Sequence, residues 1–271
     1  MKKFKLKHFP LLALAFLFLT CASNPLTGKS TMAFIPNSSL FPMAFQEYSQ
    51  FLSENSVIKG TADAQMVERV GKNIREAAEK WLSSEGHSDY LNDYEWEYNL
   101  VDSKEVNAWC MPGGKIVVYT GILPLTRTED GLAAVMGHEV SHALLNHGQQ
   151  RMSAGLLQQL GAIGVALGAQ VAGLSEDAQS VISLAYSLGS TYGGVLPFSR
   201  SNESEADHYG LILMTIAGYN PEESVPFWER MAAMGGGTLE FLSTHPVPET
   251  RIRQLQGWIP EAREKAKSFG K

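Results

Sequence analysis

Cysteine and net positive charge are both scarce in this chain of 271 residues. The two cysteines, Cys21 and Cys110, could form neither a disulfide-stapled scaffold nor a zinc site of four thiolates. Lysine and arginine number 22 against 28 aspartate and glutamate residues, a formal net charge of −6, so we expect no nucleic-acid partner. Any metal must therefore be bound by histidine and carboxylate side chains.

Charge is missing altogether from two long stretches, residues 152–175 and 178–199. By length each could span a membrane, which takes about 20 predominantly apolar residues. The first stretch, however, contains three glutamines and five glycines, and a hydrocarbon core disfavours both an unpaired amide and a weakly apolar helix. We therefore favour a helical hairpin packed through its glycines over insertion into a membrane.

The first twenty residues have the layout of an export signal. Lysines precede an uncharged apolar run, residues 9–20, which is too short to span a bilayer as a helix and favours a cleaved signal. Cys21 is then either an ordinary free cysteine or, as we prefer, the lipidated first residue of a bacterial lipoprotein. This divides the chain into a signal peptide (1–20), a lipidated tether (21–42) and one domain (43–271).

Apolar periodicity divides that domain into helices, a small sheet and further helices. Over residues 46–81 apolar side chains recur at helical spacing, which predicts one or two amphipathic helices. Three short aromatic and β-branched runs follow at 96–101, 105–109 and 116–119, with turn residues between the last two. The helical period then returns from residue 121. We predict an α+β fold that is mainly helical and has a small antiparallel sheet.

Two histidines lie four residues apart inside an apolar helical segment, in the pattern His138-Glu139-x-x-His142. Residues four apart share one face of an α-helix, so both imidazoles could bind the same metal, most readily zinc. Glu139 lies about 100° around the helix from His138, where a carboxylate would reach a metal-bound water as general base. The pattern can arise by chance, but the apolar helix around it favours a metal site.

A catalytic zinc site needs a third protein ligand and keeps a fourth position for water. Gly148 stands where a metzincin would have its third histidine, which excludes that subclass. His147 lies about 180° from His138 on a continuous helix, and we interpret it as part of the helix C-terminal cap.

A polar helix start at residues 199–210 offers the remaining ligands. Glu203 and Asp207 are four apart and share a face, whereas Glu205 lies about 200° from Glu203 and cannot reach the same ion. Glu203 could bind the metal while Asp207 accepts the second N–H of a ligating histidine. A solvated acidic helix start, stabilised by the helix dipole, is equally compatible with these residues.

These motifs together resemble peptidase family M48, which includes HtpX and the CAAX prenyl endopeptidases. The resemblance rests on five segments: His138–His142, Phe198–Arg200 with Glu203-x-x-Ala206-Asp207, Asn107–Gly114 before Ile116–Gly121, Thr244–Arg251, and Cys21–Gly28. The segment around His245 resembles the exported bacterial branch, and the one at Cys21 its lipoprotein members.

The resemblance implies a zincin-type (gluzincin) metallopeptidase domain with one Zn²⁺ per chain and zinc-dependent endopeptidase activity. It implies Glu203, not Glu205, as the third ligand beside the two motif histidines, with Asp207 behind them. It also places His245 near the metal, either as a movable fourth ligand that latches the site or as a donor to the oxyanion.

We expect the substrates to be unfolded or misfolded proteins, bound in extended form by addition to a sheet edge. The strand would be the one containing Ile116 and Val117, or its partner with Asn107, Ala108 and Trp109. The uncharged hairpin could cover the cleft as a lid.

The export signal and the resemblance together predict quality control of cell-envelope proteins. The enzyme would lie in the periplasm, lipid-anchored to the outer membrane of a Gram-negative bacterium. The rival hypothesis is a chaperone or assembly factor whose metal is latched and which cuts little.

Overall fold

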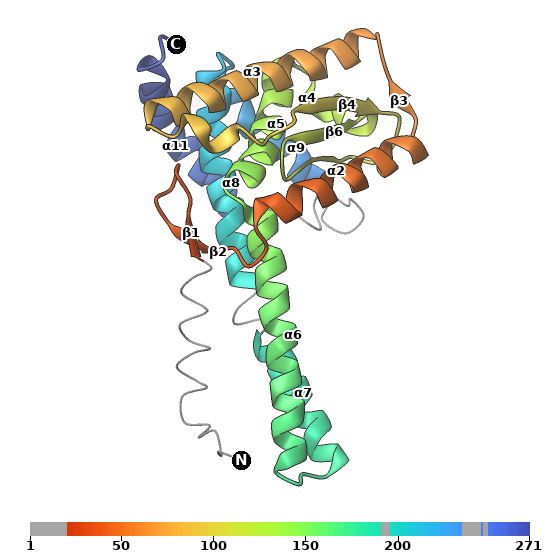
Figure 1. The fold of residues 1–271 in the computed structure, drawn as a ribbon. Helices are drawn as coiled ribbons and strands as arrows, with labels where there is room; N and C mark the ends of the chain where they lie inside the picture. The colour runs from red at the N-terminus through yellow and green to blue at the C-terminus, as the bar shows by residue number, and fades with distance from the viewer. Residues whose placement is uncertain (1–20, 191–195, 235–244, 246–248) are drawn as a thin grey trace.

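The computed structural model describes residues 21–190, 196–234, 245 and 249–271. The predicted signal peptide, residues 1–20, lies outside this part. Helices gather around a small sheet to form the body of the molecule, and one long pair of helices leaves it on one side (Figure 1).

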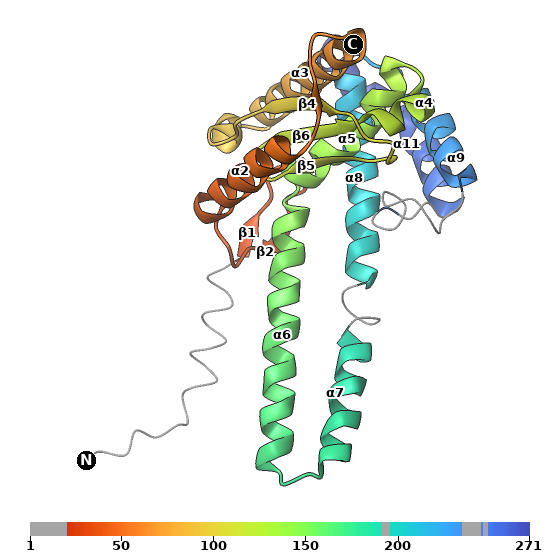
Figure 2. The ribbon, with the colours of Figure 1, turned by 90° about the vertical axis from the view of Figure 1, so that its right-hand side faces the viewer.

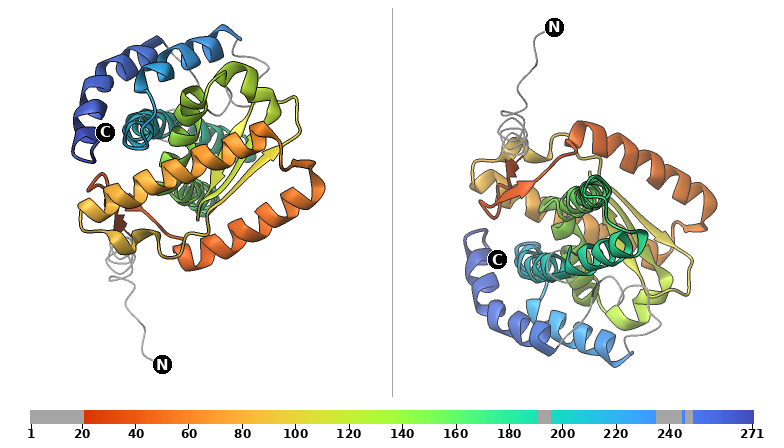
Figure 3. Two further views of the ribbon diagram at one scale, coloured as in Figure 1. Left: turned by 90° about the horizontal axis from the view of Figure 1, so that it is seen from above. Right: turned by 90° about the horizontal axis from the view of Figure 1, so that it is seen from below.

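Two helices begin the body, as the apolar period predicts. They are α2 (Asn37–Glu54) and α3 (Ala62–Ser84). The Thr61 hydroxyl caps α3 by accepting a hydrogen bond from the Ala64 N–H at 3.2 Å. One face of α3 is fully buried, and α2 lies across the sheet from it, so the two helices cover opposite faces of the sheet (Figure 3).

The sheet has four strands in the order β3 (Val57–Ile58), β4 (Glu97–Val101), β6 (Lys115–Tyr119) and β5 (Ala108–Met111). The predicted sheet is confirmed, but its purely antiparallel pairing is wrong, because β4 and β6 run parallel. The β5–β6 hairpin docks onto β4 through its second strand, which leaves β5 at the sheet edge. Local patterns predict strands but do not decide which strand of a hairpin faces the rest of a sheet.

Strand β6 is buried along its whole length. Its side chains alternate between two apolar clusters: Ile116 and Val118 enter the main core, while Val117 and Tyr119 join Tyr48 of α2. A strand covered on both faces reads as a continuous apolar run, which is why the sequence shows Ile-Val-Val-Tyr here.

The N-terminal segment is more ordered than a tether. β1 (Cys21–Ser23) and β2 (Ser30–Met32) form an antiparallel ribbon. Between them, the buried Asn24 amide donates a hydrogen bond to the Leu144 carbonyl at 2.8 Å and fixes the ribbon to the body.

The centre of the body is the crossing of α5 (Glu129–Leu144) and α8 (Leu196–Ile216). A Cβ added to Gly137 would lie 2.7 Å from the Gly210 carbonyl oxygen, so only glycines permit this approach. The remaining elements are short helices and the C-terminal layer: η2 (Ser88–Leu91), η3 (Thr120–Ile122), α4 (Leu123–Thr126), η5 (Pro221–Glu223), α9 (Ser224–Ala233) and α11 (Glu249–Lys267).

The described parts of the uncharged stretches belong to a helical hairpin, α6 (His147–Val171) and α7 (Glu176–Ser190), which extends away from the body (Figure 2). Packing through glycines is absent at three positions of α6, because a Cβ added to Gly155, Gly164 or Gly168 would meet no atom within 4 Å. The hairpin does not fold back as a lid, and only its base adjoins the catalytic motifs. Composition predicted the hairpin but not that it extends away from the body. Its direction depends on the angle at which α6 leaves the end of α5.

Candidate metal centre

The two motif histidines project from one face of α5, as their spacing predicts. Their Nε2 atoms lie 3.1 Å apart, and both rings are buried. Helix α5 is buried from Gly131 to its end, so the sequence around the motif is apolar or small and the polar motif residues are the exception.

The α5–α8 crossing brings Glu203 to the two histidines. One carboxylate oxygen of Glu203 lies 3.4 Å from His138 Nε2 and the other 3.3 Å from His142 Nε2. Because Gly137 and Gly210 let the helices approach, the stretch of α8 from Glu203 to Asp207 passes beside the motif.

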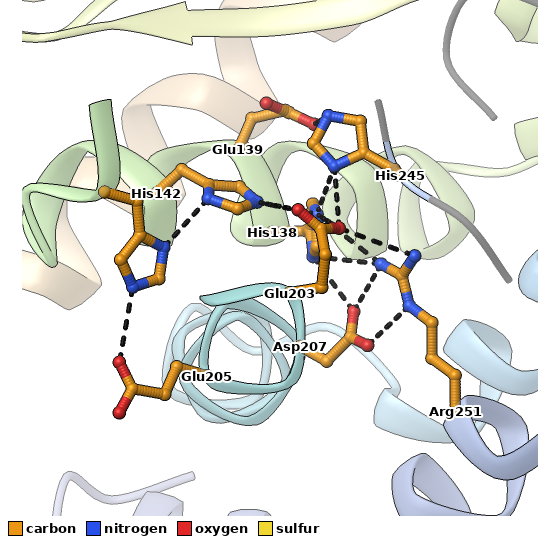
Figure 4. A network of polar contacts seen from close by, with 9 residues as sticks. His138, Glu139, His142, Glu203, Glu205, Asp207, His245 and Arg251 are labelled. Carbon is orange, nitrogen blue, oxygen red and sulfur yellow. Dashed lines mark hydrogen bonds and ion pairs between the residues drawn. The ribbon is translucent and has the colours of Figure 1, made fainter. Parts of the chain in front are cut away.

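His245 completes a group of four. Its Nδ1 lies 2.8 Å from a Glu203 oxygen and 3.2 Å from His138 Nε2 (Figure 4). One ligand atom from each of His138, His142, Glu203 and His245 lies within 4.8 Å of the others. Zinc with nitrogen and oxygen ligands at about 2.0–2.1 Å requires tetrahedral edges of about 3.3 Å, so this spacing and donor set fit a zinc ion.

The outward nitrogen of His138 is held by Asp207. Its Nδ1 lies 2.9 Å from an Asp207 oxygen, and Arg251 donates to both oxygens of that carboxylate, in one case at 2.7 Å. The buried Arg251 guanidinium lies over the Trp228 ring, 3.6 Å from its centroid. Such a chain fixes the orientation and tautomer of a metal-binding imidazole. Sequence reasoning missed Arg251, although it closes the Thr244–Arg251 segment.

The outward nitrogen of His142 is held by His147, which corrects the prediction of a helix cap. The two Nδ1 atoms lie 2.9 Å apart, and His147 Nε2 lies 3.3 Å from Glu205, which in turn pairs with Lys29 of the N-terminal ribbon. The error has a physical cause. Asn146 takes a left-handed conformation with φ 58°, so the helix axis breaks there, and α6 begins at His147, which turns back toward His142.

Charge in the centre is balanced by these contacts. Burial alone would lower the pKa of His138, but its hydrogen bonds to Asp207 and Glu203 outweigh this and raise the pKa to about 9. Burial lowers the pKa of His142 well below its usual value. Burial opposes ionisation of Glu203, yet its histidine partners keep the pKa of that carboxyl far below normal. In the same way Arg251 and His138 overcome burial and lower the pKa of Asp207.

Glu139 differs from the other acids of the centre. Burial raises the pKa of its carboxyl, and its Oε1 has no hydrogen-bond partner in the described part of the chain. The nearest cation-forming atom is His245 Nε2 at 3.6 Å. A carboxylate oxygen that has no hydrogen-bond partner and lies beside a candidate metal position is available to a water or a substrate.

A cleft of about 580 Å³ leads to the centre between α2, α6 and the edge strand β5. Asn107, Ala108 and Trp109 line it together with Glu139. The alternative edge, with Ile116 and Val117, is wrong, because β6 pairs with β4 on one side and β5 on the other.

Comparison with known proteins adds to this geometry. The model of peptidase family M48 matches residues 68–259. The chain is 39% identical over 178 residues to the mitochondrial metalloendopeptidase OMA1 of Schizosaccharomyces pombe, covering 65% of this chain and 50% of the relative. It is 26% identical over 266 residues to human OMA1, covering 95% and 49%. It is 30% identical over 167 residues to the beta-barrel assembly-enhancing protease of Escherichia coli, covering 58% and 33%.

The comparison corrects two predictions. The chain spans about half the length, or less, of these relatives. The yeast and bovine relatives are mitochondrial enzymes of eukaryotes, so the prediction of a Gram-negative periplasm and outer membrane is wrong. Assignment to an exported bacterial lipoprotein branch has no support either. The family itself is confirmed, because its model matches most of the chain: this protein belongs to peptidase family M48.

Proposed function

We propose that this chain is a zinc-dependent metalloendopeptidase that cleaves peptide bonds in unfolded or misfolded proteins. One observation carries the proposal: ligand atoms of His138, His142, Glu203 and His245 lie within 4.8 Å of one another, beside a buried carboxylate, Glu139, whose Oε1 has no hydrogen-bond partner among the described residues. A structural zinc site has no use for such a carboxylate. The named relatives are metalloendopeptidases, which supports the same activity.

His138, His142 and Glu203 would hold the ion. Zinc supplies Lewis acidity and makes water a nucleophile near neutral pH. Glu139 takes a proton from the attacking water and passes it to the leaving amine, a role that suits a carboxyl whose pKa burial raises toward neutral. Asp207 and His147 keep the two imidazoles in the tautomer that presents Nε2 to the ion.

His245 gives the centre two states. In the described conformation its Nδ1 occupies the fourth ligand position, which a catalytic site keeps for water. Movement of His245 away from Glu203 opens that position and leaves its imidazole near the cleft, where it could donate to the oxyanion. We therefore propose that His245 is the latch of a latent enzyme.

The edge strand β5 would bind the substrate. It has β6 on one side, and along the other side it lines the cleft that contains Glu139. Main-chain pairing with Asn107, Ala108 and Trp109 selects an extended chain rather than a sequence, which fits unfolded substrates.

Membrane attachment at the N-terminal end is a further part of the proposal. The residue concerned is Cys21, which follows the apolar run 9–20 of the predicted cleaved signal and would carry the lipid. Mass spectrometry of the purified chain and of its Cys21-containing peptide tests this, because an acyl group adds a defined mass to both. The Cys21→Ser variant should lack that added mass.

Cleavage of casein by the purified full chain tests the activity. We expect loss of cleavage on chelation, recovery with added zinc, and a rate about 100-fold lower or more in Glu139→Gln. Glu129→Gln makes the same change in the first turn of the same helix, at a half-buried glutamate that pairs with Arg69, and should behave as the wild type. Cutting by Glu139→Gln at the wild-type rate would overturn the proposal.

A latched chaperone is the second candidate, favoured by the fourth ligand from His245. It predicts that Glu139→Gln and the wild type suppress aggregation of denatured protein equally and that neither cuts, even after His245→Ala. An enzyme with a latch instead cuts faster after that substitution, or stops cutting if His245 is the oxyanion donor.

A further inference from the structure

The hairpin of α6 and α7 presents apolar side chains to the outside. Leu160, Ile163 and Leu167 are each 56% exposed, and Val181 and Leu184 of α7 are 66% and 60% exposed. The exposed apolar residues of α6 follow steps of three and four and share one side of the helix. Within the described residues, α6 is the one helix with the length and composition to cross a membrane.

We propose that the hairpin inserts into the hydrocarbon core of a lipid bilayer and holds the body at its surface. The uncharged part of α6, residues 152–171, is about 30 Å long at 1.5 Å per residue, the thickness of that core. A helical hairpin satisfies its own backbone hydrogen bonds, as hydrocarbon requires.

The charges at the two ends of the hairpin agree with this placement. Arg151 and Arg200 are exposed and flank the uncharged stretches where the hairpin joins the body. The opposite end carries Glu176 and Asp177, in the first turn of α7. Arginines at the base would lie among phosphate headgroups, and the acidic tip would reach the far interface.

The N-terminal ribbon supplies independent support. β2 lies against the base of α6, where the Phe34 N–H donates to the Ser153 hydroxyl at 3.2 Å (Figure 1). The ribbon begins at Cys21, the residue proposed to carry a lipid. A lipid on Cys21 would therefore lie at the end of the ribbon, whose second strand is beside the base of the hairpin.

A bilayer fits this surface better than a protein partner does. Protein interfaces have a polar rim with charged residues around their apolar centre. Residues 152–175 contain no charge on any side, although most of them are exposed. The base residues Arg151 and Met152 also line the cleft, so the bilayer surface would lie next to the opening of the cleft.

Site-directed spin labelling of the full chain tests the insertion. In a Cys21→Ser, Cys110→Ser background, a nitroxide is attached at Ile163→Cys, and the control label at Met234→Cys, an exposed apolar site of the body. With phosphatidylcholine vesicles, we expect the label at 163 to lose access to a water-soluble nickel complex severalfold and to gain access to oxygen. The label at 234 should stay accessible to nickel.

Three results would overturn the proposal. Label 163 could remain accessible to nickel with vesicles, could be shielded before vesicles are added, as in a dimer of two hairpins, or could be shielded only by denatured casein. A second set of variants separates the hairpin from any N-terminal anchor. A label at Val181→Cys reports on the triple variant Leu160→Gln, Ile163→Gln, Leu167→Gln. In that variant the label should become accessible to the nickel complex even when the chain stays on the vesicle. With Met234→Gln in place of the three changes, the label should stay shielded.

Discussion

The metal centre and the hairpin both depart from the usual arrangement, in which charged side chains are exposed and apolar side chains are buried. The centre buries ionised groups: Glu203 is 6% exposed and Asp207 3%, with Arg251 at 4% beside them. The hairpin exposes apolar ones, such as Leu160 at 56%. Charges are tolerated inside because each has an opposite partner, and apolar groups are tolerated outside if something other than water covers them. Both departures mark sites of binding, one for a metal and one for a bilayer.

Removal of a metal ligand should have the largest effect. Glu203→Gln takes the charged ligand from the centre and should weaken zinc binding by more than about 100-fold. That loss exceeds the loss expected from substituting a residue that only hydrogen-bonds to a ligand. Competition with a chromophoric chelator measures this. Glu222→Gln, an exposed glutamate, serves as control and should bind zinc normally. Retention of wild-type affinity by Glu203→Gln would remove it from the ligand set.

Loss of the buried arginine should cost the most stability. Arg251→Met leaves Asp207 ionised and buried without its partner, so the free energy of unfolding should fall by roughly 3–5 kcal/mol. Urea denaturation measures it. Arg253→Met, an exposed arginine on the same helix, should change little. The double variant Arg251→Met, Asp207→Asn should recover part of the loss, and no recovery would mean that Arg251 acts by packing on Trp228 alone.

Substitution of the residues that hold His142 should lower the affinity for zinc less than loss of a ligand does. His147→Ala and Glu205→Gln each remove one link of the chain to His142 Nδ1, and we expect zinc affinity about 10- to 100-fold lower. His208→Ala, which removes a histidine paired with Glu261 near the surface, is the matched control. Equal affinities in all three variants would contradict a role for His147 in orienting His142.

Truncation in the hairpin should have the smallest effect. Without membranes, Leu160→Ala should change the free energy of unfolding by less than about 0.5 kcal/mol, because its side chain packs against little. Met136→Ala, fully buried in α5, should cost about 2–5 kcal/mol. A comparable loss of stability at both positions would show that Leu160 packs against protein, and the hairpin would then not present an exposed apolar surface.

Local pattern was sufficient for much of the fold and for the centre of the site. Spacing of four placed His138 and His142 on one face, and the same rule placed Glu203 and Asp207 together and Glu205 away from them, while the choice of Glu203 as ligand came from the family resemblance. The continuous apolar and β-branched run at 116–119 predicted β6. Each of these features depends on a single helix or strand, so the local sequence is enough to predict it.

The errors arose where elements meet. His147 was misplaced because one left-handed residue, Asn146, breaks the helix on which its angle was calculated. Arg251 reaches Asp207 only through the packing of α11 on α8, which no local spacing reveals. The hairpin was expected to pack through its glycines, but Gly155, Gly164 and Gly168 of α6 face open space. The predicted location failed for another reason, since an N-terminal composition does not identify the membrane it serves.

X-ray absorption at the zinc edge of the purified chain measures which atoms hold the ion. Because the chain has so little cysteine, the ion must be held by imidazole and carboxylate. We predict one zinc per chain with nitrogen and oxygen ligands at about 2.0–2.1 Å and no sulfur. A sulfur shell at about 2.3 Å, or a chain that binds no zinc, would contradict this prediction.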